Sequence, residues 1–327
     1  MRLLTVGNNE AGQRLDKLLA KYLDQAGKGF LYKMLRKKNI TLNGKKCDGS
    51  ERLQEGDEIR LFLSDETIEK FSGGRGQSAS RIVSGPPLSI VYEDSHILLI
   101  NKPAGILSQK AKETDVSMVE LVISYLLRSG QLMEEELKTF RPSVCNRLDR
   151  NTSGLIAAGK TLAGLQMLSR AFKDRTIHKY YLCIVLGRLE GKQKIQGFLR
   201  KDEKTNRVVV SKTEVPGSSP IATSYTPLKS NGAFTMLQVE LLTGRTHQIR
   251  AHLASLGHPV AGDYKYGRPA VNDEIQKVYG ISSQLLHSWK FIMPRELDEP
   301  FVYLAGREFT AELPEPFEKM AKAENLF

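Results

Sequence analysis

The chain has 327 residues but only three cysteines, Cys47, Cys145 and Cys183, and no long apolar run. A membrane-spanning helix needs about 18 or more consecutive apolar residues, and the best runs here are short, as in residues 97–100. An odd number of cysteines without a Cys-x-x-Cys pair excludes a disulfide framework and a recognisable zinc motif, and it suits a reducing compartment. Residues 1–10 lack the apolar segment of a secretory signal. We therefore predict a cytoplasmic protein that does not enter a membrane.

The chain has few acidic residues relative to basic ones: 37 Asp and Glu against 48 Lys and Arg, which gives a formal net charge of +11. Such an excess on a chain without membrane segments favours a polyanionic partner, usually nucleic acid. The apolar content of 40% and charged content of 26% are ordinary for a globular protein and exclude a wholly disordered or collagen-like chain. The length suits one large domain or two unequal ones.

Residues 1–64 are predicted to form a small basic module. Apolar residues at 15, 18, 19, 22 and 23 mark one face of a helix, and a second such group follows at 30–35. Asn43-Gly44 is a preferred hairpin-turn pair, and residues 59–63 form a short strand. Six basic residues are predicted to contact the phosphates of a nucleic acid, with a solvated basic face as the alternative: Lys33, Arg36, Lys37, Lys38, Lys45 and Lys46.

Residues 65–85 are predicted to be a flexible linker, because residues 72–80 are rich in glycine and serine. In residues 86–327, apolar strands joined by short turns interleave with amphipathic helices, one of them capped by Asp115 and another spanning 246–256. This order favours an α+β domain, with a largely antiparallel mixed sheet flanked by helices, over a doubly wound parallel sheet.

One match to a known motif is rejected on its context. Residues 154–161 fit the phosphate-binding pattern G-x-x-x-x-G-K-[ST]. A phosphate-binding loop follows a buried strand and exposes its backbone amides, whereas here a polar run comes first and the interior is Leu-Ile-Ala-Ala. We expect this segment to be a buried strand.

Three short segments combine unusual residue choices. Residues 146–154, Asn-Arg-Leu-Asp-Arg-Asn-Thr-Ser-Gly, place an acid between two arginines; residues 178–185 form an aromatic strand entered from a basic turn. Residues 243–254 crowd Arg245, His247, Arg250 and His252 into the N-terminal half of a helix. That end of a helix already carries positive partial charge, so the crowding is unfavourable unless an acid or anion lies nearby.

Together these segments closely resemble the pseudouridine synthases of large-subunit ribosomal RNA, of the RluA/RluC/RluD type. Residues 147–154 resemble the aspartate motif of that family, Lys179-x-Tyr181 its tyrosine motif, and residues 244–267 its third motif. Asn101-Lys102-Pro103-Ala104-Gly105 resembles an early turn of the family. The N-terminal module is similar to the RNA-binding domain named after ribosomal small-subunit protein four. Where the family usually has His, this chain has Asn146, to which we assign no acid–base role.

The resemblance implies a pseudouridine synthase fold and isomerisation of uridine in RNA without metal or cofactor, by a protein that suits a monomer. It assigns Asp149 as the carboxylate beside the sugar and base, which burial would protonate unless a cation offset it, and Arg250 as that cation. Tyr181 would contact the target uracil. Arg147 would fill the stack that the flipped base leaves, with a phosphate contact as the alternative.

Ribosomal RNA of the large subunit is the expected partner. Transfer RNA, or a non-catalytic role as an RNA-binding assembly factor, are the alternatives. Retention of Asp149, Tyr181 and Arg250 argues against the non-catalytic alternative.

Overall fold

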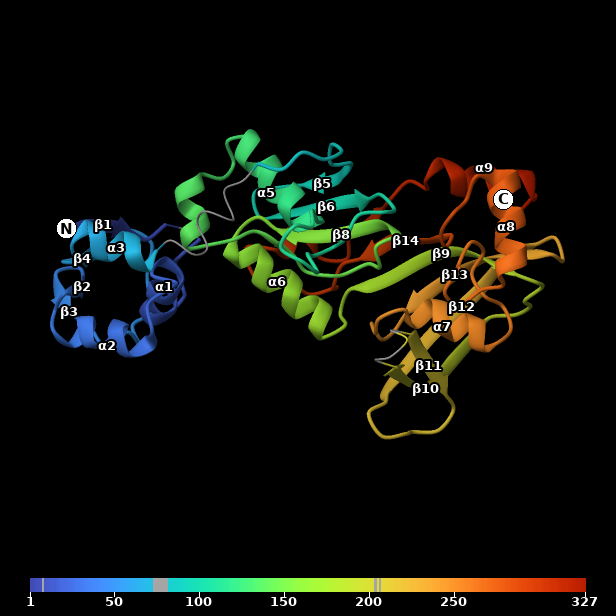
Figure 1. Ribbon diagram of the computed structural model, residues 1–327, viewed down its shortest axis with the longest axis horizontal. Coiled ribbons are helices and arrows are strands. Elements are labelled where there is room, and N and C mark those ends of the chain that lie inside the picture. Colours follow the sequence, from blue (N-terminus) through green and yellow to red (C-terminus); the bar gives the residue numbers. More distant parts are fainter. Residues whose placement is uncertain (8, 73–81, 203–204, 206) are drawn as a thin grey trace.

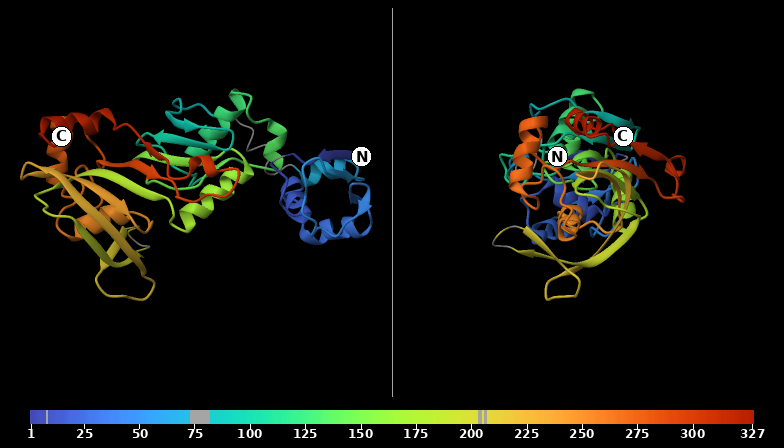
Figure 2. Two further views of the ribbon diagram at one scale, coloured as in Figure 1. Left: turned by 180° about the vertical axis from the view of Figure 1, so that it is seen from behind. Right: turned by 90° about the vertical axis from the view of Figure 1, so that its right-hand side faces the viewer.

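The computed structural model describes residues 1–7, 9–72, 82–202, 205 and 207–327. The N-terminal module lies at one end of the long axis and the C-terminus at the other (Figures 1 and 2). Between them the larger domain is built on one long, twisted sheet (Figure 1). None of the helices in the described ranges is long and apolar enough to cross a bilayer.

The module packs short helices on a four-stranded sheet of order β1-β4-β2-β3. Asn43 and Gly44 both take positive φ, 50° and 72°, as the predicted tight hairpin requires. Residues 65–71 of the segment predicted as linker form a further helix. Its Ile68 is buried in the core of the module, and the ring centroids of Phe71 and Phe30 lie 4.6 Å apart. These contacts hold the helix on the module. Most of the glycine- and serine-rich stretch, residues 73–81, lies outside the described residues. The elements are β1 (Arg2–Thr5), α1 (Leu15–Tyr22), α2 (Lys28–Arg36), β2 (Ile40–Leu42), β3 (Lys45–Lys46), β4 (Glu58–Leu61) and α3 (Asp65–Phe71).

The second sheet has eleven strands within the described residues, in the order β11-β10-β12-β13-β9-β14-β8-β6-β5, with β7 and β15 paired to β8 and β14. Among these pairs only β14 and β8 run parallel, so the predicted α+β fold with a largely antiparallel sheet is confirmed. The strands are β5 (Ile90–Glu93), β6 (Ile97–Lys102), β7 (Ser143–Val144), β8 (Ser153–Gly159), β9 (His178–Leu186), β10 (Gln193–Asp202), β11 (Arg207–Ser211), β12 (Ser219–Ser230), β13 (Phe234–Leu241), β14 (Leu286–Ile292) and β15 (Glu308–Thr310).

Helices cover both faces of the central part of this sheet, and β6, β8 and β9 are apolar on both sides for that reason. On β6, Leu98 and Ile100 belong to a core with α5 (Met118–Arg128), whereas Ile97 and Leu99 belong to a core with α6 (Leu162–Lys173). On β9, Leu182 and Ile184 pack toward α8 (Pro269–Tyr279) and α9 (Glu315–Ala323). The alternate residues of β9, which include Tyr181, face α7 (Gln248–Ser255). This register brings Tyr181 to the same side of the sheet as α7.

Two local predictions meet different outcomes. The segment that fits the phosphate-loop pattern is the buried strand β8, paired with β6, as expected. Asp115, in contrast, does not cap α5, so that prediction is wrong. Its carboxylate accepts hydrogen bonds from the backbone of residues 111 and 112, while Glu120 bonds the N–H and hydroxyl of Ser117 just before the helix begins. Ser117 is the capping residue of α5, and Glu120 completes a capping box with it.

Candidate active site

Asp149 lies in the turn between β7 and β8, and this turn is anchored by its neighbour Leu148. The backbone N–H and C=O of Leu148 both pair with Oγ of Ser108, at 2.9 and 2.8 Å, and its side chain is buried. Asp149 and Arg147, on either side of Leu148, both line one cavity. The anchor therefore fixes the backbone that presents the acid.

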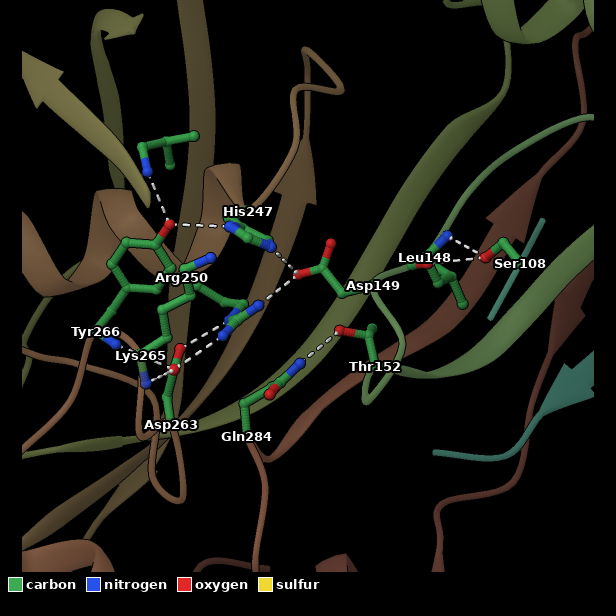
Figure 3. A network of polar contacts seen from close by, with 11 residues as sticks. Ser108, Leu148, Asp149, Thr152, His247, Arg250, Asp263, Lys265, Tyr266 and Gln284 are labelled. Carbon is green, nitrogen blue, oxygen red and sulfur yellow. Dashed lines mark hydrogen bonds and ion pairs between the residues drawn. The ribbon is translucent and has the colours of Figure 1, made fainter. Parts of the chain in front are cut away.

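Arg250 of α7 joins two carboxylates from distant parts of the chain. Its Nη1 donates to Oδ2 of Asp149 at 2.7 Å, and its Nε and Nη2 donate to the two oxygens of Asp263 at 2.7 and 2.9 Å (Figure 3). Burial works to lower the pKa of Arg250, but Asp263 and Asp149 outweigh it and hold the pKa above its ordinary value. The expected contact between Arg250 and Asp149 is confirmed, and the two acids account for the basic crowding at this helix.

Asp149 has one occupied and one open oxygen. Oδ2 accepts the hydrogen bond from Nη1 of Arg250 and lies 3.8 Å from Nε2 of His247. Within the described part of the chain, Oδ1 has no protein hydrogen-bond partner (Figure 3). The carboxylate borders the cavity. The acid is thus oriented through one oxygen and offers the other to a ligand.

The cavity measures about 450 Å³, within the range of about 300–1,000 Å³ typical of small-ligand sites. Tyr181 lies in its wall, and burial, with a smaller effect from the charge of Asp149, raises the pKa of its phenol to about 12. The lining thus combines apolar and aromatic surface with charged groups. Its main members are Leu107, Arg147, Asp149, Tyr181, Arg245, His247, Ile249, Arg250 and Leu286. Four residues singled out by the sequence, Arg147, Asp149, Tyr181 and Arg250, therefore meet at one site.

Sequence reasoning left Lys102 without a role, although its motif was noted. Lys102 is fully buried at the end of β6, and its Nζ donates to the carbonyls of Pro103, Ile106 and Arg150 at 2.8–2.9 Å. Burial lowers the pKa of Lys102 to about 7, although the charge of Asp149 opposes the shift. The ammonium ties the early turn to the residue directly after Asp149. The clue in the sequence is a lysine that ends an otherwise apolar strand.

Replacing Lys102 with Met keeps the length of the side chain but removes all three donors. We expect kcat to fall by about 100-fold with little change in KM, because a misplacement of about 1 Å at a reacting group has that effect. Steady-state kinetics on RNA measures it. Lys160→Met is the matched control. The side chain of Lys160 is 8% exposed and its Nζ binds Glu93 at 2.7 Å outside the cavity, so kcat of this variant should stay within about threefold. Equal losses in the two variants would contradict the positioning role.

The six basic residues predicted to bind RNA are not part of the cavity. All six are exposed, at the C-terminal end of α2 and on the β2–β3 hairpin of the module. Asn146 lies beside the active turn, where its side chain bonds the backbone of residues 155 and 157 on β8. That arrangement gives Asn146 a structural contact and fits the absence of an acid–base role. In the part of the chain that the structure describes, no group of three His, Cys, Asp or Glu side chains could hold a metal ion.

The family described as RNA pseudouridylate synthase matches residues 96–255 of this chain. A ribosomal large subunit pseudouridine synthase D from Nitrosomonas europaea is 30% identical over 88% of this chain and 78% of its own length. A ribosomal large subunit pseudouridine synthase C from Vibrio cholerae is 29% identical over 88% and 87%. The solved structure of human RNA pseudouridylate synthase domain containing 4 superposes with a TM-score of 0.57 at 18% identity, over 72% of this chain and 93% of that one, and supports the fold.

The fold and these similarities define the class: the chain is an RNA isomerase. It belongs to the RNA pseudouridylate synthase family, as the resemblance of its motifs predicted.

Proposed function

We propose that this protein converts uridines of large-subunit ribosomal RNA to pseudouridine in the cytoplasm, with Asp149 as the reacting carboxylate. The observation that carries the proposal is the pair of Asp149 and Arg250 at the wall of a cavity of about 450 Å³. The names of the curated relatives support the choice of RNA.

The chemistry needs a carboxylate beside the ribose and the base. The N1–C1′ bond breaks, the uracil turns, C5 bonds to C1′, and the C5 proton is exchanged for one on N1. Atoms and charge balance without water, redox partner or energy donor, and the proposal therefore assigns no metal and no cofactor. Attack at C1′, attack at C6 and removal of the C2′ proton each require a carboxylate beside the nucleoside, and the open Oδ1 of Asp149 supplies one.

Tyr181 and Arg147 complete the proposed site. With a pKa near 12, Tyr181 is a phenol rather than a phenolate at neutral pH, so it offers an aromatic face and an O–H to the flipped uracil. Arg147 is exposed at the cavity, where its planar guanidinium can occupy the stack that the base has left.

The test of the proposed function is release of tritium from RNA labelled at C5 of uridine, followed by chemical mapping of pseudouridine. The unmodified protein is incubated separately with large-subunit ribosomal RNA, small-subunit ribosomal RNA and transfer RNA. Release from large-subunit RNA, at defined positions, is expected. Release only from transfer RNA would overturn the assigned substrate, and no release from any RNA would overturn the proposed activity.

Arg147→Ala should weaken the binding of structured RNA more than the binding of single-stranded RNA. Extruding a base from a stack costs a few kcal/mol, and a side chain that fills the gap offsets part of this cost. We expect KM for a stem-loop substrate to rise about tenfold more than KM for an unstructured oligonucleotide. Arg188→Ala, at an exposed arginine outside the cavity, is the control and should raise neither. Equal increases on both substrates would indicate a plain phosphate contact.

The basic cluster of the module should act through phosphates. Replacing Lys33, Arg36, Lys37 and Lys38 together with Gln should leave kcat unchanged, raise KM and flatten the salt dependence of binding. The slope of log K against log salt should decrease by about 0.7–0.9 for each phosphate that the variant no longer neutralises. Lys277→Gln with Lys319→Gln removes exposed charges from α8 and α9 as the control. An unchanged slope in the fourfold variant would show a solvated face without a role in RNA binding.

A further inference from the structure

His247 occupies an unusual backbone position between Asp149 and Tyr266. It precedes α7 with φ 55° and ψ 16°, a left-handed conformation that is unfavourable for a residue with a side chain. Its Nδ1 lies 2.9 Å from the hydroxyl of Tyr266, and its Nε2 lies 3.8 Å from Oδ2 of Asp149 (Figure 3). Strain of this kind persists where the surroundings require it, and here it aims one ring nitrogen at each partner.

The Tyr266 end determines which nitrogen carries the proton. The hydroxyl oxygen of Tyr266 accepts a hydrogen bond from the backbone N–H of Val208 at 3.0 Å. A phenol has one hydrogen, and within the described residues its remaining hydrogen-bonding neighbour is Nδ1 of His247. When the hydroxyl donates this hydrogen to Nδ1, Nδ1 is unprotonated and the proton of the neutral ring lies on Nε2.

The Asp149 end leads to the same tautomer independently. Nε2 faces Oδ2 of Asp149, which already accepts a hydrogen bond from Nη1 of Arg250. An N–H directed at this anion is attracted to it, whereas a lone pair would be repelled. Burial, with Arg250 and Lys265 acting in the same direction and the two acids opposing it, lowers the pKa of His247 below its usual 6.5. The ring is thus neutral at pH 7, with its single proton toward Asp149.

We infer that His247 is a positioning residue, held by Tyr266 as the Nε2–H tautomer, and that this N–H and Arg250 together fix Oδ2 of Asp149 so that Oδ1 faces the nucleoside. The inference rests on the proposed function in its second half only, since the tautomer is a property of the free protein. It also ties β11 to the reacting acid, because the donor to Tyr266 is the backbone of Val208 on that strand.

The tautomer is read directly by NMR of the full chain labelled with ¹⁵N-histidine at pH 7. His247→Gln identifies the signal among the six histidines. We expect Nδ1 of His247 to resonate as an unprotonated nitrogen and Nε2 as a protonated one, and Tyr266→Phe to produce a mixture of tautomers. Tyr264→Phe, at an exposed tyrosine that bonds Asp273, is the matched control and should leave the signal unchanged. A protonated Nδ1 in the unmodified protein would overturn the inference, as would an unaltered signal in Tyr266→Phe.

Kinetics of two replacements tests the positioning role. The amide nitrogen of Gln reaches the place of Nε2, whereas that of Asn reaches only the place of Nδ1. We expect His247→Gln to retain about a tenth of kcat and His247→Asn to lose about 100-fold, with KM within about threefold in both. Equal kcat values for the two variants, or a loss of kcat/KM that comes from a higher KM, would overturn the positioning role. If the unmodified protein isomerises no RNA, the proposed function fails, while the NMR result still decides the tautomer.

Discussion

Asp149→Asn should lose at least about 1,000-fold in pseudouridine formation while RNA binding stays within about threefold. The amide matches the carboxylate in shape, but it carries no negative charge and is a poor nucleophile at carbon. Because the Asp149 side chain is 22% exposed and borders a cavity, the free energy of unfolding should change by less than about 1 kcal/mol. Tritium release gives the rate, filter binding gives the affinity, and urea unfolding gives the stability.

Asp298→Asn is the matched control for this replacement. The Asp298 side chain is 96% exposed, and Arg170 lies 4.0 Å from it, outside the cavity. The same chemical change there should leave the rate unchanged within about twofold. Activity of Asp149→Asn above about a tenth of normal would contradict the assignment of Asp149 as the reacting group.

The sequence predicted the parts of this protein that depend on short-range patterns. Spacing of apolar residues located α1, α2 and the buried strand β8, and Asn43-Gly44 located the hairpin. The resemblance of the motifs placed Asp149, Tyr181 and Arg250 at one site, and the structure brings them to one cavity. These features can be predicted from the sequence because each depends on neighbouring residues in the chain or on a short motif.

Other features depend on interactions that local patterns do not encode. The pairing of Arg250 with buried Asp263 and the hydrogen bonds of Lys102 to three carbonyls arise only when separate segments meet. The left-handed backbone of His247 has no marker, since histidine also fits an ordinary helix start. Asp115 misled for a different reason: as an isolated residue it suits a helix cap, but α5 begins only after Ser117, which is its capping residue and bonds Glu120.

Arg250→Met should abolish activity and, because of Asp263, also destabilise the fold. Asp263 is 1% exposed, and its two oxygens receive two of the nitrogens of Arg250. Removing one partner of a buried ion pair leaves the other charge uncompensated and costs about 3–5 kcal/mol. Loss of Arg250 therefore affects the fold as well as the reaction, because of its contact with Asp263. Urea unfolding measures the loss, and Arg188→Met, at an exposed pair of the same 2.7 Å separation, should cost no more than about 1 kcal/mol.

A second replacement separates the two roles of Arg250. Asp263→Asn in the Arg250→Met background removes the stranded charge, while Oδ1 of the new amide can still accept from the backbone N–H groups of Lys265 and Tyr266. We expect the double variant to regain at least about 2 kcal/mol of the lost stability. Its rate should nevertheless remain at least about 100-fold below normal, because Asp149 still lacks its cation. Recovery of the rate together with stability would mean that Arg250 serves the fold alone. Recovery of stability without rate would locate its catalytic contribution in the contact with Asp149.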